Sequence, residues 1–384
     1  MTEELKALLD YMEENIDIEH AEFVERLHIK SLNYEDVPYI PLTVIYPLDG
    51  SFEPFPYSEA FDDPEKMLYN ELLWSFSGNL NSIKIKDHFP LQIRSNHGTG
   101  IIASLFGAKC RIINDGMPWV DHFDDGIEGV KRILRKGSPD LTDGLGRKVL
   151  ETYQYFYETL REYPKCFRAI HITQPDLQGP FDIAHLLLGM DVFFEINDNP
   201  EIIQDLLELI TETYIKFRKS VEPYLTDKAG DDAIYVHGGI FGGKVIIKDD
   251  TALINLSKEQ YEKFSKPYNE KILEEFTGSI HYCGPERKWH HEVLLHPKLR
   301  SINYGNPEMH DLEYVYGKWS QDRKSIVFWG YNQEYDFIQK AYDLGIKTGM
   351  TFACKAGNYQ SALNILKNHT QRKECEKYAE HYSM

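Results

Sequence analysis

The feature that most constrains the fold is a repeating alternation of short apolar runs and longer amphipathic stretches. Each apolar run ends in polar or glycine-bearing residues, and a stretch with helical periodicity follows it. The predicted strands are 39–46, 88–96, 168–173, 233–237, 279–285, 299–304, 325–329 and 347–354. The predicted helices are 64–76, 140–163, 200–226, 257–276, 286–296, 307–320, 333–344 and 359–380. Eight strands, each followed by a helix, are the count of an α/β fold of the (βα)8 TIM barrel type.

Three segments fall outside this repeat. Apolar stripes within 3–30 predict an N-terminal helical extension (1–38) that covers one end of the domain or takes part in a homodimer contact. Residues 108–125 predict a hairpin inserted after the second strand, and 190–195 fit either a strand or the end of a helix. No linker or low-complexity tract divides the chain, so we expect a single domain over 1–384.

Charge and composition exclude several classes of protein. The chain has 42 basic and 61 acidic residues, a net charge of −19, which repels the phosphates of nucleic acids. No apolar run is long enough for a membrane span, and the first residues lack the pattern of a signal peptide. Five widely spaced cysteines do not form a disulfide framework. We therefore expect a soluble cytoplasmic protein with reduced thiols.

A pair of potential metal ligands lies at the end of the fifth predicted strand. Side chains alternate between the two faces of a strand, so His281 and Cys283 point the same way. An imidazole and a thiolate that project together are two of the three protein ligands of a catalytic zinc site. His-x-Cys alone is a weak signal, and a core histidine beside a buried thiol is the alternative.

Cys354, at the end of the last predicted strand, is the expected third ligand. In a TIM barrel the carboxyl ends of all strands open onto one mouth, so Cys354 can meet the other two despite its distance along the chain. Three protein ligands leave the fourth position of zinc open, which is the catalytic pattern. Two thiolates balance the charge of zinc, and a substrate thiol that binds there loses its proton yet stays nucleophilic. Such a site suits attack on a methyl group.

Several stretches of the chain resemble the uroporphyrinogen decarboxylase superfamily, and within it the corrinoid-dependent methyltransferase branch. They are Gln178–Ala184, Asn199–Glu201, Leu256–Tyr261, His281–Gly284 and the Cys354 strand with Asn358. The similarity runs from about residue 85 to 370, and the His-x-Cys-Gly sequence combined with the late cysteine selects the branch. The resemblance implies a distorted (βα)8 TIM barrel with zinc at His281, Cys283 and Cys354. It also implies methyl transfer between a separate corrinoid (cobalamin) protein and a small thiol such as coenzyme M.

The chain departs from the superfamily pattern in three places. No arginine occurs between Arg26 and Arg94, where the decarboxylases carry arginines that grip porphyrinogen carboxylates. No Asp-x-His-x-x-Gly corrinoid motif occurs, so a corrinoid must arrive on a partner protein. The sequence Trp329–Gln333 replaces the Gly-Asn-x-Asp-Pro that is frequent in the family. The alternatives are a decarboxylase of a porphyrinogen-like acid and a non-catalytic barrel that binds a corrinoid or tetrapyrrole.

Other polar residues at strand exits are candidates for the same mouth. The expected catalytic residues are His97, His237 and Asp176, and the expected substrate or cofactor contacts are Gln178, Asn303, Tyr304 and Tyr331. For each of them, an ordinary loop or core role is the alternative reading.

Overall fold

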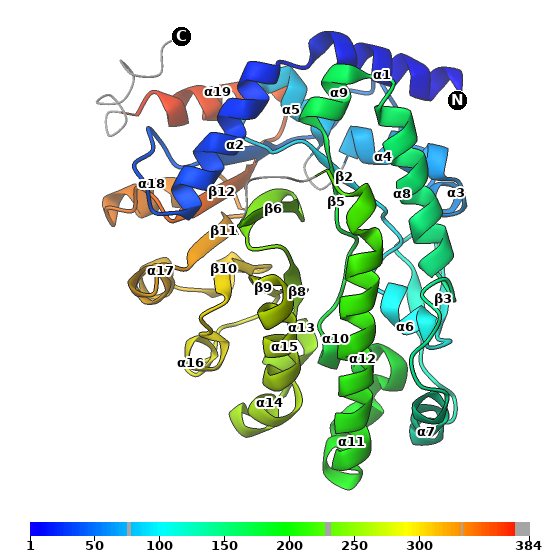
Figure 1. The fold of residues 1–384 in the computed structure, drawn as a ribbon. Helices are drawn as coiled ribbons and strands as arrows, with labels where there is room; N and C mark the ends of the chain where they lie inside the picture. The colour runs from blue at the N-terminus through cyan, green and yellow to red at the C-terminus, as the bar shows by residue number, and fades with distance from the viewer. Residues whose placement is uncertain (75–77, 227–231, 332, 373–384) are drawn as a thin grey trace.

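A computed structural model describes residues 1–74, 78–226, 232–331 and 333–372. Its main element is a parallel six-stranded sheet in the order β1-β12-β11-β10-β9-β8 (Figure 1). These strands are β1 (Leu42–Ile45), β8 (Ile246–Lys248), β9 (Gly278–Tyr282), β10 (Leu299–Tyr304), β11 (Ser325–Trp329) and β12 (Met350–Lys355). A second, two-stranded parallel sheet pairs β2 (Gln92–Arg94) with β5 (His171–Thr173).

Single backbone contacts link the small sheet to both edges of the large one. The amide of His88, just before β2, donates to the carbonyl of Leu42 in β1 at 3.1 Å. On the other side, the amide of Gly179, beyond β5, donates to the carbonyl of Lys248 in β8 at 2.6 Å. The ladders among the described residues do not form one continuous ring. The structure is therefore a mixed α/β fold with a barrel-like arrangement, and a closed barrel stays an expectation.

The fourth predicted strand is present, but its expected place in the parallel sheet was wrong. Residues 233–237 form β6 (Ala233–Val236), which pairs antiparallel with β7 (Gly239–Gly242). His237 (φ 53°) and Gly238 (φ 83°) make the two-residue turn with positive φ at both positions that joins such hairpins. The parallel strand at this point of the order is instead β8, which follows the hairpin.

The β6–β7 hairpin fills the space that the inner faces of the strands surround. It contacts β9, β10 and β11, and its side chains form a buried cluster separate from the main core. The members include Tyr235, Ile240 and Phe241 of the hairpin with Val327 and Ala353 of the sheet. The much larger second cluster lies between the other face of the strands and the helices. In β12, for example, Ala353 belongs to the inner cluster while Phe352 and Cys354 belong to the outer one.

Helices cover the outer face of the sheets (Figure 1). Those of the first half are α1 (Glu3–Asn15), α2 (Ile18–Leu32), α3 (Tyr57–Asp62), α4 (Pro64–Trp74), α5 (Asn79–Ile85), α6 (Ile101–Leu105), α7 (Ile127–Lys136), α8 (Gly146–Leu160), α9 (Pro164–Ala169), α10 (Pro180–Leu188) and α11 (Val192–Asp198). The others are α12 (Pro200–Val221), α13 (Asp250–Asn255), α14 (Lys258–Phe264), α15 (Lys266–Phe276), α16 (His290–Leu294), α17 (Leu312–Gln321), α18 (Phe337–Asp343) and α19 (Tyr359–Thr370), with short 3₁₀ turns at Gly189–Asp191, Glu222–Tyr224 and Pro307–Met309. No described helix has the length and apolarity that a membrane crossing requires.

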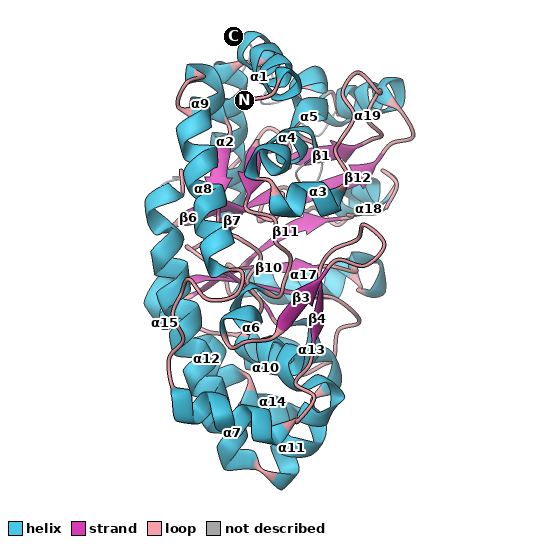
Figure 2. Cartoon of the chain, turned by 90° about the vertical axis from the view of Figure 1, so that its right-hand side faces the viewer, coloured by secondary structure: helices cyan, strands magenta, loops and turns pink. Residues whose placement is uncertain are grey.

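The additions to the repeat take the forms that the sequence indicates. Helices α1 and α2 lie across one end of the molecule, where α2 contacts β7, β11 and β12. The inserted hairpin pairs β3 (Lys109–Arg111) with β4 (Trp119–Asp121) and packs against α10 (Figure 2). Of the two readings of 190–195, the helical one is correct, because α11 begins there.

Buried histidines bond helices α2 and α19 to backbone carbonyls beside β1. His28 of α2 donates to the carbonyl of His88 at 2.7 Å, and His369 of α19 donates to the carbonyl of Ile40 at 2.7 Å. His88 in turn accepts from the amide of Leu42 at 3.0 Å. Burial lowers the pKa of His28 and of His369 to about 4, so these rings are neutral in the fold.

We expect the free energy of unfolding to fall between pH 7 and pH 5. The unfolded chain binds protons below the ordinary histidine pKa of 6.5, whereas buried His28 binds them only near pH 4, so acid favours unfolding. The loss at pH 5 is about 1–2 kcal/mol for each such histidine. Urea unfolding at both pH values measures it. Between pH 7 and pH 5 the His28→Gln variant should lose less unfolding free energy than the wild type does. The exposed control His122→Gln should lose as much as the wild type. An unchanged pH dependence in His28→Gln would contradict this reading.

Candidate functional site at the exits of β8 and β9

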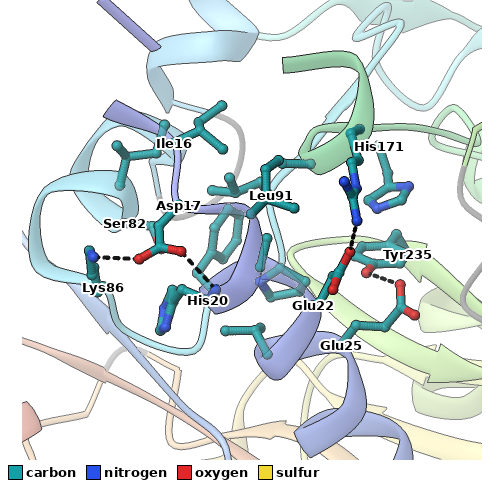
Figure 3. Close-up of a pocket in the computed structure, with 18 residues that line it drawn as sticks. Ile16, Asp17, His20, Glu22, Glu25, Ser82, Lys86, Leu91, His171 and Tyr235 are labelled. Atoms are coloured by element: carbon teal, nitrogen blue, oxygen red, sulfur yellow. Dashed lines mark hydrogen bonds and ion pairs between the residues drawn. The ribbon is translucent and has the colours of Figure 1, made fainter. Parts of the chain in front are cut away.

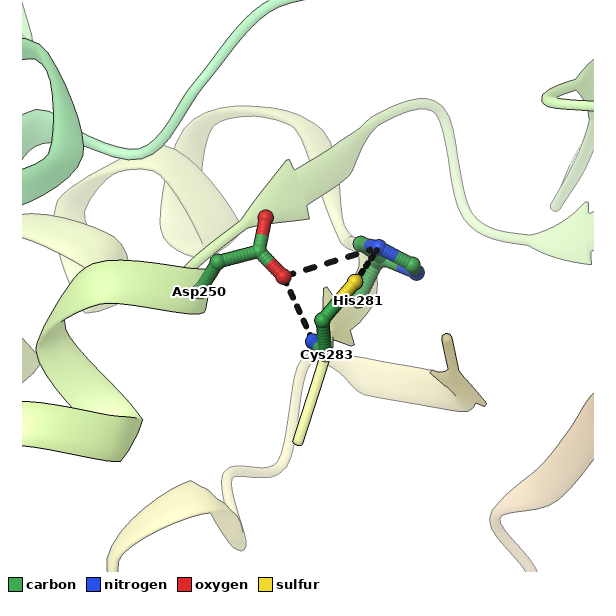
Figure 4. Close-up of side chains that lie close together, drawn as sticks. All are labelled: Asp250, His281 and Cys283. Carbon is green, nitrogen blue, oxygen red and sulfur yellow. Dashed lines mark hydrogen bonds and ion pairs between the residues drawn. The ribbon is translucent and has the colours of Figure 1, made fainter. Parts of the chain in front are cut away.

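Three potential metal ligands meet where β8 and β9 end. Lys248 lies opposite His281 in the parallel ladder, so Asp250, two residues beyond Lys248, comes beside Cys283. A carboxylate oxygen of Asp250, a ring nitrogen of His281 and the Sγ atom of Cys283 all lie within 4.8 Å of one another (Figure 4). His281 is buried, Asp250 is half-buried and Cys283 is exposed, so the group opens to solvent on one side.

The distances within this group are short. His281 Nε2 lies 3.6 Å from Cys283 Sγ and 3.7 Å from the Oδ1 atom of Asp250. Asp250 Oδ1 also accepts the amide of Cys283 at 2.5 Å, which ties the two strand exits together. Burial, followed by the charge of Asp250, raises the pKa of the Cys283 thiol to about 12.

Asn303 of β10 sets the orientation and tautomer of His281. The amide group of Asn303 donates from Nδ2 to the carbonyl of Val327 at 2.7 Å, so its Oδ1 faces His281. Because that oxygen can only accept, His281 carries its proton on Nδ1 and leaves the lone pair on Nε2. Burial lowers the pKa of His281, which also favours the neutral ring. Its Nε2 is thus prepared to bind a metal ion.

The loop after Cys283 is held by side chains from the next strand exit. Gly284, with φ 91°, donates its amide to Asn306 Oδ1 at 2.9 Å. Its carbonyl accepts from His310 Nε2 at 2.9 Å. A Cβ at Gly305 would lie 2.4 Å from Cys283 Sγ, so the sulfur packs directly on that glycine. The position of the thiol is therefore fixed from several sides.

A buried ionic cluster adjoins the metal-ligand group. The carboxylate of Asp176 lies 2.5 Å from the Lys248 ammonium and 3.3 Å from the Arg94 guanidinium, and Gln178 donates to it at 3.4 Å. Burial opposes ionisation of Asp176, but the charges of Lys248 and Arg94 hold its pKa at about 2. Lys248 is the ladder partner of His281, so this charged cluster lies directly beside the histidine.

His237 completes this environment from the hairpin. Its ring centroid lies 5.0 Å from that of His281 in an edge-on contact. Burial and then the charge of Lys248 lower its pKa well below the ordinary value, so the ring is neutral. Gln92 fixes the turn by accepting from Gly238 at 3.1 Å and donating to the Gly239 carbonyl at 3.2 Å. Of the predicted residues, His237, Asp176, Gln178 and Asn303 thus gather around His281 and Cys283.

Cys354 does not join this group. It belongs to the outer core together with Phe352, whereas its neighbour Ala353 belongs to the inner cluster. Alternation along β12 therefore turns the Cys354 thiol away from the enclosed side. Burial, followed by the charge of Asp87, raises the pKa of this thiol to about 12.

Three further predicted residues have other surroundings. His97 bonds Ser95 Oγ at 2.9 Å and packs on Phe61 of α3. Tyr304 lies on the opposite face of β10 from Asn303, where its hydroxyl accepts from Trp319 at 2.7 Å. Tyr331 packs against the inner cluster and stacks on Phe328.

The residues that the sequence interpretation missed are Asp250, Lys248 and Arg94. All three lie at the carboxyl ends of strands. The sequence interpretation took His237 as the end of the fourth strand, whereas the parallel strand at this point is β8, which ends at Lys248. The run Val245-Ile246-Ile247-Lys248-Asp249-Asp250 is a strand that ends in paired acids, and it carried the signal. Assigning the strand there would have placed Asp250 beside Cys283.

The donor set fits zinc. Carboxylate oxygen, imidazole nitrogen and thiolate sulfur are all zinc ligands. With Asp250 and Cys283 ionised and His281 neutral, the set carries two negative charges, which match the charge of the ion. Three protein ligands leave a position open for another molecule.

A separate cavity of about 210 Å³ lies at the other ends of β2 and β5, beneath α2 (Figure 3). Its wall carries the ion pair of Lys86 with Asp17, and a hydrogen bond from Tyr235 to Glu25. These polar side chains of the cavity wall are therefore paired with one another. The cavity holds none of the metal-ligand group.

Comparison with known proteins supports the fold. No family profile matches the sequence, and no curated protein is detectably similar to it. A solved structure of a methyltransferase from Methanosarcina mazei is similar, with a TM-score of 0.60 and 16% sequence identity. The match covers 92% of this chain and 98% of that one. At this identity the likeness shows the fold alone. It does not show that the chain belongs to the corrinoid-dependent branch.

Asn303→Ala should weaken zinc binding by about 10- to 100-fold, because His281 then loses the partner that fixes its tautomer. Competition with a chromophoric chelator measures the affinity. Tyr304→Phe is the matched control, since it alters the neighbouring residue on the opposite face and should leave the affinity unchanged. Equal affinities for the Asn303→Ala variant and the wild type would contradict the role given to Asn303.

Asp176→Asn should lower the free energy of unfolding by about 3–5 kcal/mol, because two buried cations lose their shared carboxylate. Thermal and urea unfolding test this. Adding Lys248→Met to the variant removes one of those cations and should restore part of the loss. If the single variant is as stable as the wild type, the cluster is not a buried ion network.

Proposed function

We propose that this protein is a zinc-dependent methyltransferase that moves a methyl group between a corrinoid on a partner protein and a small thiol. The observation that carries the proposal is the meeting of Asp250, His281 and Cys283 at the exits of β8 and β9. The fold likeness to a methyltransferase over nearly the whole chain supports it. Both features agree with the distorted (βα)8 TIM barrel that the sequence resemblance implies.

His281 and Cys283 are the residues that would hold the ion. Zinc bound there would lower the pKa of an acceptor thiol and leave its sulfur nucleophilic. Asn303 keeps the proton of His281 on Nδ1, and the bonds of Gly284 keep the Cys283 loop in place. These contacts hold the ligand atoms close together, which favours binding of an ion.

The surroundings of the site favour a small polar acceptor. Lys248 and Arg94 both contact the carboxylate of Asp176, and the Glu71 carboxylate accepts the amide of Arg94 at 3.1 Å, so several buried charged groups lie beside the site. His237 presents a neutral ring beside His281. The exposed side of Cys283 is where a larger methyl donor has access, which is consistent with a corrinoid presented by a partner protein.

Protein purified without added metal should contain about one zinc per chain, and it should methylate a thiol with methylcobalamin as donor. Cys283→Ser and His281→Ala should lose the metal and reduce the methylation rate by at least about 100-fold, because both remove a ligand. Elemental analysis and the absorbance change of demethylated cobalamin measure the two properties. Cys110→Ser, which alters a half-buried thiol on β3, should retain both.

Failure of these measurements would separate the alternatives. Metal-free, inactive wild-type protein would contradict the zinc mechanism. Turnover of a porphyrinogen acid instead of a thiol would indicate a decarboxylase. Tight binding of cobalamin or a tetrapyrrole without any turnover would indicate a carrier.

A further inference from the structure

We infer that Asp250, rather than Cys354, is the third protein ligand of the metal ion held by His281 and Cys283. The inference rests on the proposed function for the identity of the ion as zinc, and it deepens that function by naming the ligand set. It gives the site one oxygen, one nitrogen and one sulfur donor. A site with Cys354 would have one nitrogen and two sulfurs.

The spacing of the donor atoms supports the assignment. Ligands of a tetrahedral zinc ion at bond lengths of about 2.0–2.3 Å lie roughly 3.3–3.8 Å apart. His281 Nε2 already lies 3.6 Å from Cys283 Sγ and 3.7 Å from Asp250 Oδ1. The separations of His281 Nε2 from the other two donor atoms are therefore those expected between ligands of one tetrahedral ion.

Asp250 is held in this position by the residue before it. Asp249 is fully buried and accepts from Tyr261 at 2.6 Å, Ser265 at 3.0 Å and Asn269 at 2.8 Å. These bonds anchor the turn from β8 into α13, so Asp250 is presented at the strand exit. Its bond from the Cys283 amide occupies one of about four acceptor positions of a carboxylate. The remaining positions are sufficient for a metal ion.

Cys354 is kept out by strand register. It lies opposite Val44 in the ladder between β12 and β1, and both side chains belong to the outer core. A one-residue slip would bring Cys354 to the enclosed side, but it would also reverse every other side chain of β12. Phe352 would then leave the outer core and enter the space that the β6–β7 hairpin fills.

The ligand set has chemical consequences. The total charge of the protein donors stays at −2, so an acceptor thiolate still makes the complex anionic. A carboxylate is a harder donor than a second thiolate, so the site should accept ions that favour oxygen and nitrogen as well as zinc. Cobalt(II) is suited to the test, since its absorption reports the number of bound thiolates.

The experiment is a titration of the full-length apoprotein with Co²⁺ alone, without methyl donor or thiol. Wild-type protein should show a sulfur-to-metal charge-transfer band of one thiolate. Cys354→Ser should leave the intensity of that band and the affinity unchanged, whereas Cys283→Ser should abolish the band. Asp250→Asn keeps an acceptor for the Cys283 amide but loses the charge, and it should weaken Co²⁺ binding at least about tenfold. Asp124→Asn, at an exposed position, is the matched control and should bind as the wild type does.

The inference is overturned if Cys354→Ser loses about half of the band, if Asp250→Asn binds Co²⁺ as tightly as the wild type, or if the wild type does not bind Co²⁺. Its failure is distinct from failure of the proposed function. A one-thiolate site that depends on Asp250, in a protein that does not methylate thiols, supports the ligand assignment and removes the methyltransferase proposal.

Discussion

The pairing of β8 with β9 is the interaction on which the site depends. One ladder places Lys248 opposite His281, and from that register follow both the contact of Asp250 with Cys283 and the closeness of the Asp176 cluster to the histidine. Backbone bonds of a parallel sheet are regular, so they transmit position with little slack. The pairing of the two strands thus sets the positions of the ligand residues, and contacts from the loops orient their donor atoms.

The hairpin between β5 and β8 explains how this register coexists with a filled interior. Its turn brings His237 to His281, and its strands occupy the space among β9, β10 and β11. Ser279 of β9 donates to the carbonyl of Gly242, so the hairpin is also bonded to the strand that carries the ligands. The same insertion that closes the interior to water supports the neutral ring beside the metal-ligand group.

Much of the fold follows from the sequence, because its signals are local. Helix α12 begins with Pro200 at its first position, and α14 begins after Ser257, which forms a capping box with Gln260. The strand at 233–237 forms, but its place in the parallel sheet was predicted wrongly, because an apolar run before His-Gly-Gly fits a hairpin turn as well as a barrel exit. Pairing partners decide between the two, and a single sequence does not contain them.

The candidate site was also predictable only where its residues lie close together in the sequence. Alternation put His281 and Cys283 on one side correctly, since His281 lies in β9 and Cys283 follows directly after its last residue. To predict the role of Asp250, one would need to know which strand pairs with β9. To predict which way Cys354 faces, one would need the register of β12. Asn303 and Tyr304 show the same limit within two residues: one contacts His281, and the other lies in the outer core. Nothing in the local sequence decides which face of β10 is enclosed.

The position of β12 between β1 and β11 also determines when the molecule can assemble. β1 pairs with β12 through residues such as Val44 and Cys354, which are separated by most of the chain. Among the described residues β12 is the strand that pairs with β1 in a ladder, so on the ribosome this ladder can form only after the last strand has been made. At about 5–20 residues per second, that interval is roughly 15–60 seconds. For that time the edge of β1 that β12 covers in the finished protein is open to pairing with other chains.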